Sequence, residues 1–296
     1  MFSSKNDYKQ LQIYKGKCFQ KQYIKKYIKA FVFDLDETLG SFADLYILWN
    51  GINHVRKESL DTIEKQQTEF NQLLDLYPEF IRFGIFNILD YLYMKKQKGL
   101  CDKIYVYTNN TCNPPWVQYI TNYFKYKLNL KDDVFDNIIQ AFKINNKVIE
   151  VNRTTHEKTH NDFINCTLLP KSTELCFIDN NLFKDMIHEK VYYIKPRSYY
   201  HSLTPDTIVQ RFLLSNTGEG LSKLFDNTNH LREFMMDWFE LNNGSRTASN
   251  KNNEVDIFVA QKMMYHVKEF FYLTQRSNKT RKRCLRVGGK NTRKNI

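Results

Sequence analysis

The chain has 296 residues, of which 42% are hydrophobic and 15% aromatic, so it can bury the core of one large domain, or of one domain with an appendage. Its net charge of +12 is concentrated at the ends: residues 1–29 hold eight Lys and one Asp, and residues 276–296 hold nine Lys or Arg and no acid. The middle is therefore net acidic, which argues against a nucleic-acid-binding surface there, and a low glycine and proline content argues against disorder over most of the length.

The first part of the chain predicts a basic arm, a strand and a helical insertion. Residues 1–29 alternate Lys with Tyr, Ile and Phe and predict either a short helix or an extended arm. Residues 30–33 are a short apolar run, which is typical of a strand buried on both faces. Residues 45–80 carry apolar positions at helical spacing, chiefly over 54–76. This segment predicts either a small cap or a side insertion that leaves an open cleft.

The next part of the chain, to about residue 200, alternates between helices and strands. Helices are predicted over 84–96, from Pro114 and Pro115 onward, and from a capping box formed by Thr154 and Glu157. Short β-rich runs predict strands over 103–107, 137–142, 147–151, 174–178 and 191–194. This alternation predicts an α/β fold with a Rossmann-like, doubly wound parallel sheet, built over residues 30–200.

The C-terminal part predicts helices and then a basic tail. Residues 201–275 form a predicted helical extension, with amphipathic helices around 231–239 and over 253–275. Residues 276–296 are strongly basic, and we expect them to be a disordered tail. Residues 278–283 resemble a nuclear-localisation or polyanion-binding patch, so nucleic acid or another polyanion is a candidate partner of the tail.

Polar side chains follow three of the predicted strands at the points where the strands end. They are, in chain order, Asp34, Asp36 and Thr38, then Thr108 and Asn109, then Asp179 and Asn180. Open α/β sheets place their ligands at the carboxyl ends of their strands, so we expect these side chains to converge. Phosphoryl transfer needs such a set: a carboxylate that attacks phosphorus, a second group that moves a proton, and a hard cation such as Mg²⁺ with oxygen ligands.

These residues resemble the haloacid-dehalogenase-like (HAD) phosphatases, and most of all their C-terminal-domain phosphatase branch, also called NLI-interacting-factor-like. Asp-Leu-Asp-Glu-Thr-Leu at 34–39 is similar to the first motif of the family, Tyr-Thr at 107–108 to the second, and Phe-Ile-Asp-Asn at 177–180 to the fourth. Arg-Phe-Gly-Ile at 82–85 looks like the Arg-Pro-Gly segment of that branch, with Phe in place of Pro. The resemblance covers roughly residues 28–200.

The resemblance implies a role for each matching residue. Asp34 would be the nucleophile that forms an aspartyl-phosphate, and Asp36 the general acid and base, with its main-chain carbonyl on Mg²⁺. Thr38 would shape the loop. The implied phosphate-binding residues are Thr108, Asn109 and Lys158, and the implied metal ligands are Asp34, Asp36, Asp179 and Asn180. Lys158 is chosen as the third-motif lysine because the family's lysine opens the helix before the last motif strand, and Lys171 is the alternative.

A competing pattern overlaps this lysine. His156, Glu157 and His160 spell His-Glu-x-x-His, which on a helix would place two imidazoles on zinc with a glutamate as base. A protease of that type also needs a third ligand and an apolar helix face, whereas the flanking residues here are polar. The pattern also leaves the three ordered strand-end motifs unexplained.

The resemblance implies a Mg²⁺-dependent phosphatase that acts on a phosphorylated substrate, with a phosphoprotein preferred. The alternatives are a phosphatase of nucleic-acid ends or small metabolites, and a catalytically silent module that binds a phosphorylated partner. The six cysteines form no Cys-x-x-Cys pair, and the sequence shows no signal peptide or membrane span. We therefore expect a reducing compartment, cytoplasmic or nuclear, and no membrane partner.

Overall fold

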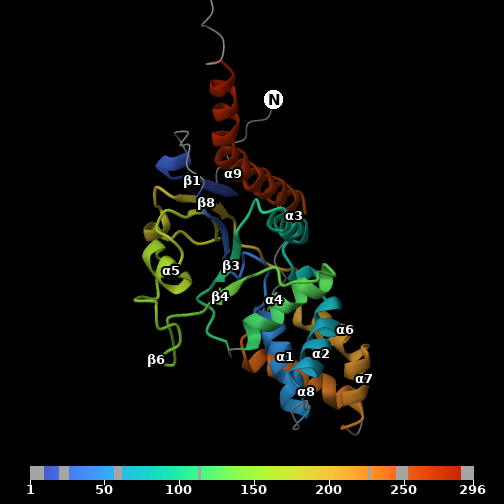
Figure 1. Cartoon of the computed structure of the whole chain (residues 1–296). Coiled ribbons are helices and arrows are strands. Elements are labelled where there is room, and N and C mark those ends of the chain that lie inside the picture. Colours follow the sequence, from blue (N-terminus) through green and yellow to red (C-terminus); the bar gives the residue numbers. More distant parts are fainter. Residues whose placement is uncertain are drawn as a thin grey trace, which may run out of the picture.

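The computed structural model describes residues 10–19, 27–56, 62–112, 115–225, 228–244 and 253–287, and from residue 275 onward only the path of the last helix (Figure 1). None of the helices in these ranges is both long enough and apolar enough to cross a membrane.

A six-stranded sheet forms the centre of the molecule. In spatial order its strands are β1 (Leu11–Lys15), β8 (Val191–Pro196), β7 (Glu174–Ile178), β2 (Lys29–Phe33), β3 (Lys103–Tyr107) and β4 (Asn137–Ile139). Every neighbouring pair is parallel except β1 with β8, which is antiparallel. The α/β class and the mostly parallel sheet are therefore confirmed.

The order of the strands reverses beside β2. From β2 the chain moves outward through β3 and β4, then returns to the opposite side of β2 to form β7 and β8. The carboxyl ends of β2 and β7 therefore border the point at which the connections diverge, and a crevice at such a point is where open α/β sheets bind ligands. Asp34 directly follows β2 and Asp179 directly follows β7.

Helices cover both faces of the sheet. The helices of the described residues are α1 (Ala43–Arg56), α2 (Ile63–Asp75), α3 (Ile85–Gln97), α4 (Pro115–Lys127), α5 (His160–Thr167), α6 (Pro205–Leu213), α7 (Asn216–Ser222), α8 (Thr228–Leu241) and α9 (Asn253–Val287). Alternate residues of β2 face opposite cores: Ala30 and Val32 lie in the core that α5 covers, and Phe31 and Phe33 in the larger one. Phe31 there stacks on Phe271 of α9, with ring centroids 5.2 Å apart.

The predicted insertion and the predicted helical extension pack on each other. Figure 1 shows α1, α2, α6, α7 and α8 gathered at one end of the molecule, beside α4. The indole N–H of Trp238 on α8 donates to the carbonyl oxygen of Ile47 on α1 at 3.0 Å. The Tyr77 hydroxyl donates to the carbonyl oxygen of Ile208 on α6 at 2.7 Å. The two segments therefore form one helical unit, although more than 100 residues separate them in the chain.

Four local predictions differ from the structure. The short elements of the fold among the described residues are three 3₁₀ helices and one hairpin: η2 (Lys17–Phe19), η3 (Pro78–Phe80), η4 (Lys184–Met186), and β5 (Lys143–Ile144) paired with β6 (Lys147–Val148). The helix predicted over 54–76 is instead the end of α1 and a separate α2, which Thr62 caps by accepting the N–H of Lys65. The strands predicted over 137–142 and 147–151 are shorter than expected.

The fourth difference concerns the helix predicted to start at Thr154. Helix α5 begins at His160, and the Thr159 side chain caps it by accepting the N–H of Asp162 at 3.0 Å. Thr154 lies before the helix and uses its hydroxyl and its N–H on the Asp162 carboxylate, at 2.9 and 3.0 Å. Thr159 therefore takes the capping role that the pattern gave to Thr154.

The two ends of the chain add elements to the fold beyond residues 30–200. Part of the predicted arm forms β1, so this part is extended, while residues 1–9 and 20–26 lie outside the described residues. Helix α9 continues to Val287, past the boundary predicted at 275. Residues 288–296 of the predicted tail also lie outside the described residues.

Candidate active site

Asp34 lies at the carboxyl end of β2, beside β7. Its N–H donates to the carbonyl oxygen of Ile178 at 2.9 Å, which continues the pairing of the two strands for one residue. The side chain is 6% exposed, and its Oδ1 accepts a hydrogen bond from Lys158 Nζ at 2.5 Å. The sheet thus presents a nearly buried carboxylate at the point where the strand order reverses.

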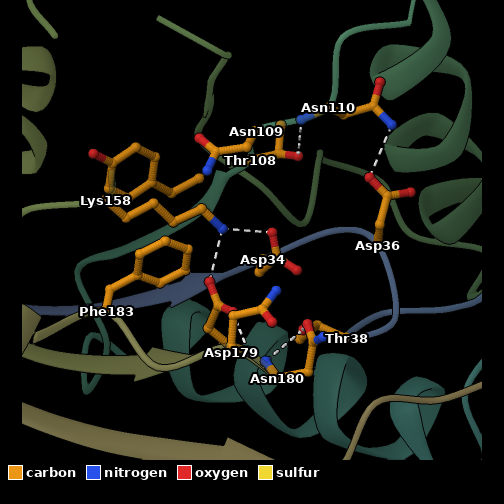
Figure 2. A network of polar contacts seen from close by, with 12 residues as sticks. Asp34, Asp36, Thr38, Thr108, Asn109, Asn110, Lys158, Asp179, Asn180 and Phe183 are labelled. Atoms are coloured by element: carbon orange, nitrogen blue, oxygen red, sulfur yellow. Dashed lines mark hydrogen bonds and ion pairs between the residues drawn. The ribbon is translucent and has the colours of Figure 1, made fainter. Parts of the chain in front are cut away.

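Lys158 lies between two carboxylates (Figure 2). Its ammonium group donates to Asp179 Oδ2 at 2.7 Å as well as to Asp34, and the residue is only 1% exposed. The rings of Tyr107 and Phe183 lie 5.6 and 5.2 Å from Nζ. Lys171, the alternative, is an exposed residue before β7. The structure therefore brings Lys158 to the strand-end carboxylates.

Asp36 has different surroundings from Asp34, although only one residue separates them. Figure 2 shows its carboxylate directed toward Asn110, whose Nδ2 donates to Asp36 Oδ2 at 2.8 Å. Glu37, the residue directly after Asp36, has a positive φ of 59°. Burial raises the pKa of Asp36 to about 6, the Asn110 hydrogen bond opposes this, and the charge of Asp34 adds to it. Asp36, which is half-buried, therefore keeps its proton to a higher pH than an ordinary aspartic acid.

Thr38 and Asn180 tie the loop after β2 to the loop after β7. The Thr38 hydroxyl donates to Asn180 Oδ1 at 2.8 Å and accepts the N–H of Asn180 at 3.1 Å. Asn180 Nδ2 donates to Glu37 and Ser198, at 3.2 and 3.0 Å. Both polar atoms of the Asn180 amide therefore bind neighbouring side chains, which holds the two loops in a fixed relation.

Thr108 and Asn109 extend the site to the end of β3. The Thr108 N–H donates to the carbonyl oxygen of Ile139 at 3.0 Å, and its Oγ1 accepts the N–H of Asn110 at 2.9 Å. The side chain of Thr108 is buried, whereas Asn109 is exposed. Figure 2 shows Thr108 on the same side of the sheet as Asp34 and Lys158. All the predicted strand-end residues thus converge on one end of the sheet.

Arg82 supports the loop that carries the two acids. Its guanidinium donates to the carbonyl oxygens of Thr38 at 2.6 Å, Arg197 at 2.8 Å, and Glu37. Burial lowers the pKa of Arg82 to about 10, so the group stays protonated at neutral pH. The resemblance pointed to this Arg-Phe-Gly segment but assigned Arg82 no role in the site. Its three partners are main-chain carbonyl oxygens, which no residue pattern in the sequence indicates.

Arg153 is a second buried arginine, and no pattern in the sequence indicates it. Its Nη1 donates to the carbonyl oxygens of Gln140 at 2.7 Å and Thr108 at 3.0 Å. Its Nη2 donates to Asn109 Oδ1 at 2.7 Å and to the carbonyl oxygen of His156 at 3.1 Å. One guanidinium therefore joins the loop after β3 to the segment that leads into Lys158.

Three acids of the site, Asp34, Asp36 and Asp179, lie around the single ammonium group of Lys158. Burial raises the pKa of Asp179, the Lys158 ammonium opposes this, and the Asp34 carboxylate raises it further. Burial lowers the pKa of Lys158, but Asp179 and Asp34 more than offset it, so the ammonium is retained. With Asp36, the acids outnumber this ammonium, and a divalent cation with oxygen ligands would offset the excess.

The His-Glu-x-x-His pattern does not form a zinc site. Residues 156–159 precede α5 and are not helical, so the two imidazoles do not share one helix face. The His156 ring packs on Phe142, with centroids 5.5 Å apart, and the His160 ring stacks on His188 at 4.0 Å. In the part of the chain that the structure describes, no group of three or more His, Cys, Asp and Glu side chains could hold a metal ion.

Comparisons of the chain with protein-family models, with curated proteins and with solved structures gave no match. The family resemblance and the roles it implies therefore remain predictions, and the geometry of the site is the basis for the function proposed below.

Proposed function

We propose that the chain is a Mg²⁺-dependent phosphatase that hydrolyses a phosphate monoester, with a phosphoprotein as the preferred substrate, through a phosphoryl group carried on Asp34. One observation carries the proposal: two neighbouring acids at the end of β2 have opposite surroundings. Asp34 contacts the Lys158 ammonium at 2.5 Å, while Asp36 contacts a neutral amide and has a pKa raised by burial. Environments that separate two carboxyl groups in this way assign one as nucleophile and the other as acid.

In the first step, an oxygen of Asp34 attacks phosphorus while the bond from phosphorus to the leaving oxygen breaks. The proton of the Asp36 carboxyl group passes to the leaving oxygen, which departs as an alcohol or a phenol. Lys158 and the Thr108 hydroxyl offset the charge on the phosphoryl oxygens. The products are the leaving alcohol and a phosphoryl group bound to Asp34.

In the second step, water attacks the phosphoryl group on Asp34. The Asp36 carboxylate, now deprotonated, takes a proton from that water, and the bond from phosphorus to the Asp34 oxygen breaks. Inorganic phosphate leaves, and both acids return to their starting states. The hydrogen bond from Asn110 holds Asp36 in place during both transfers.

Mg²⁺ fits the chemistry of these donors. It binds proteins through one or two carboxylates plus substrate phosphate oxygens and keeps several waters, so it does not need a closed cluster of side chains. Asp34 and Asp179 would hold it, together with the Asp36 carbonyl oxygen. Asn180 would act through water, because its amide oxygen already accepts the Thr38 hydroxyl. The cation would offset negative charge on the transferred phosphoryl group.

A turnover assay tests the proposal. A chromogenic phosphate ester and acetyl phosphate, each with Mg²⁺, should be hydrolysed by the parent protein. Asp34→Asn should lower kcat by on the order of 10³-fold or more, because it removes the attacking carboxylate. Asp90→Asn, an exposed acid on α3, is the matched control. If the parent shows no Mg²⁺-dependent turnover above that of Asp34→Asn, the chain is not a phosphatase. The remaining alternative is then a catalytically silent module that binds a phosphorylated partner.

A further inference from the structure

A cavity of about 460 Å³ lies beside Asp36. Asp36 and Asn110 line it, whereas neither Asp34 nor Lys158 is among its described lining residues. In an in-line displacement the leaving oxygen departs on the side of phosphorus opposite the nucleophile, within hydrogen-bond reach of the acid. Asp36 is that acid in the proposed mechanism, so the cavity is positioned to hold the leaving group.

Aromatic side chains make up much of the cavity wall. Phe42 directly precedes α1, Tyr46 lies in its first turn, Trp116 lies on α4 and Tyr200 in the segment after β8. The Tyr46 and Trp116 rings meet edge to face, with centroids 5.0 Å apart. A volume of this size lies within the usual range for small-molecule sites, and ring walls favour a flat aromatic guest through stacked and edge contacts.

The charges of the cavity wall disfavour a substrate that carries a second phosphate group. Among the described residues that line the cavity, none is Lys or Arg, and the acids are Asp36, Glu37 and Asp44. Asp44 lies 3.1 Å from His201 Nε2, and the N–H of Leu203 donates to Nδ1 of the same ring. A polyphosphate or a nucleic-acid end would bring further negative charge against these acids without a basic partner.

Because Asp34 is nearly buried, the substrate group that carries the phosphate must be long enough to reach it. This carboxylate is 6% exposed, so the phosphorus atom must pass below the surface to meet it. A phosphate on a phenol ring reaches further from a peptide backbone than a phosphate on a serine hydroxyl. The cavity wall also includes the amides of Asn242 and Asn243, at the end of α8, which can bind main-chain groups beside such a ring.

We propose that this site hydrolyses aryl phosphates, with the phosphotyrosine side chain as the protein-borne case, and that the cavity beside Asp36 holds the phenol ring. This inference rests on the proposed function and narrows its substrate. The bond from phosphorus to the phenol oxygen breaks, and the phenol leaves with the proton of Asp36 while phosphorus stays on Asp34.

Matched peptides that differ only in carrying phosphotyrosine or phosphoserine test the inference, with free phosphotyrosine, AMP and acetyl phosphate as further substrates. The phosphotyrosine peptide should exceed the phosphoserine peptide in kcat/KM by about tenfold or more, the gain from ring packing of this kind. Free phosphotyrosine distinguishes the two possible kinds of substrate. A rate equal to that of the phosphotyrosine peptide indicates a small aryl phosphate as substrate, and a lower rate indicates a peptide.

Two variants probe the cavity itself. Ala43→Phe, at an exposed lining position, fills the cavity without removing core atoms, and Tyr46→Ala removes one ring from its wall. Each should lower the ratio of phosphotyrosine to acetyl phosphate turnover by about tenfold. Tyr265→Ala is the control, because this ring is 60% exposed on α9 and lies outside the cavity lining.

Two results would overturn the inference while leaving the proposed function in place. One is that the protein hydrolyses acetyl phosphate, but hydrolyses the phosphoserine peptide or AMP as fast as the phosphotyrosine peptide, or faster. The other is a phosphotyrosine preference that Ala43→Phe leaves unchanged. If no ester and no acetyl phosphate is hydrolysed with Mg²⁺, the proposed function itself fails and this inference with it.

Discussion

Single residues at the end of β2 carry most of the proposed chemistry. Asp34 and Asp36 belong to one short loop, yet one faces an ammonium group and the other an amide. The backbone is left-handed at Glu37, directly after Asp36, and the Arg82 guanidinium binds the carbonyl oxygens of Glu37 and Thr38 in this loop. The sequence predicted both acids from their position after a strand, but it held no information on their separate partners.

Asp36→Asn tests the acid role. With a phosphoserine peptide, kcat should fall by roughly 10²- to 10⁴-fold, because a serine leaving group needs the proton. With a nitrophenyl ester the fall should be smaller, since that leaving group is a weak base and departs without help. Equal losses with both substrates, measured as initial rates under saturation, would contradict the assignment.

Lys158→Met tests the charge balance of the site. Removing the ammonium leaves Asp34 and Asp179 facing each other in a buried place, which should cost about 3 kcal/mol of unfolding free energy. Mg²⁺ should recover part of that loss. Lys171→Met, at an exposed position, is the matched control and should change little. Urea denaturation with and without Mg²⁺ measures both, and equal stabilities of the two variants would count against the buried ion cluster.

At the scale of elements, the loops at the strand ends are held by two arginines whose main-chain partners could not be predicted from the sequence. Strands 103–107 and 174–178 were predicted at their observed bounds because short apolar runs between turns give a strong signal. Arg153 gave none, because its partners are largely main-chain oxygens, and Thr108 and Asn109 lie about 45 positions earlier in the chain. Main-chain acceptors are common to every sequence, so no residue pattern marks them.

Arg153→Lys tests this support. A lysine ammonium cannot reproduce the planar fork that binds two elements at once. Unfolding free energy should fall by about 2 kcal/mol as buried acceptors lose their donor. The value of kcat/KM should fall by about tenfold or more as Thr108 and Lys158 lose their fixed relation. Arg232→Lys, an exposed arginine paired with Asp206, provides the comparison. Wild-type kinetics in Arg153→Lys would show that the loops are held by other contacts.

At the scale of the whole molecule, segments far apart in sequence complete one another. The insertion and the C-terminal extension share a helical unit, and α9 returns over the sheet to pack on Phe31. The sequence predicted the amphipathic helices, because apolar spacing shows which face is buried. It could not predict their partners, since a stripe of apolar residues is compatible with many surfaces.

Glu269 on α9 connects the last helix to the sheet, and its ionisation predicts an acid-sensitive contact. It accepts hydrogen bonds from Lys15 of β1 at 2.9 Å and from the Tyr192 hydroxyl of β8 at 2.5 Å. Burial raises the pKa of Glu269, but the hydrogen bonds from Tyr192 and Lys15 outweigh it, so the net shift is downward. A lowered pKa in the folded state adds stability above the unfolded value, and that stability is lost as pH falls through the folded value.

Glu269→Gln should therefore reduce unfolding free energy by about 1 kcal/mol at neutral pH. The difference from the parent should shrink as the pH falls below the ordinary glutamate pKa of about 4.3 and through the lower folded pKa, because the parent carboxylate becomes protonated over that range. Denaturation curves across that range measure the difference. A gap that stays constant from neutral to acidic pH would contradict the ionic role of this residue.

The most direct test of the central claim is rapid-quench peptide mass spectrometry of Asp36→Asn after mixing with an aryl phosphate and Mg²⁺. Replacing Asp36 removes the base for the second step, so the intermediate should accumulate. We predict a phosphoryl adduct on the peptide that contains Asp34, absent when Asp34→Asn is added to the same protein. An adduct on another residue, or turnover by the parent protein without any adduct at Asp34 in Asp36→Asn, would contradict the account.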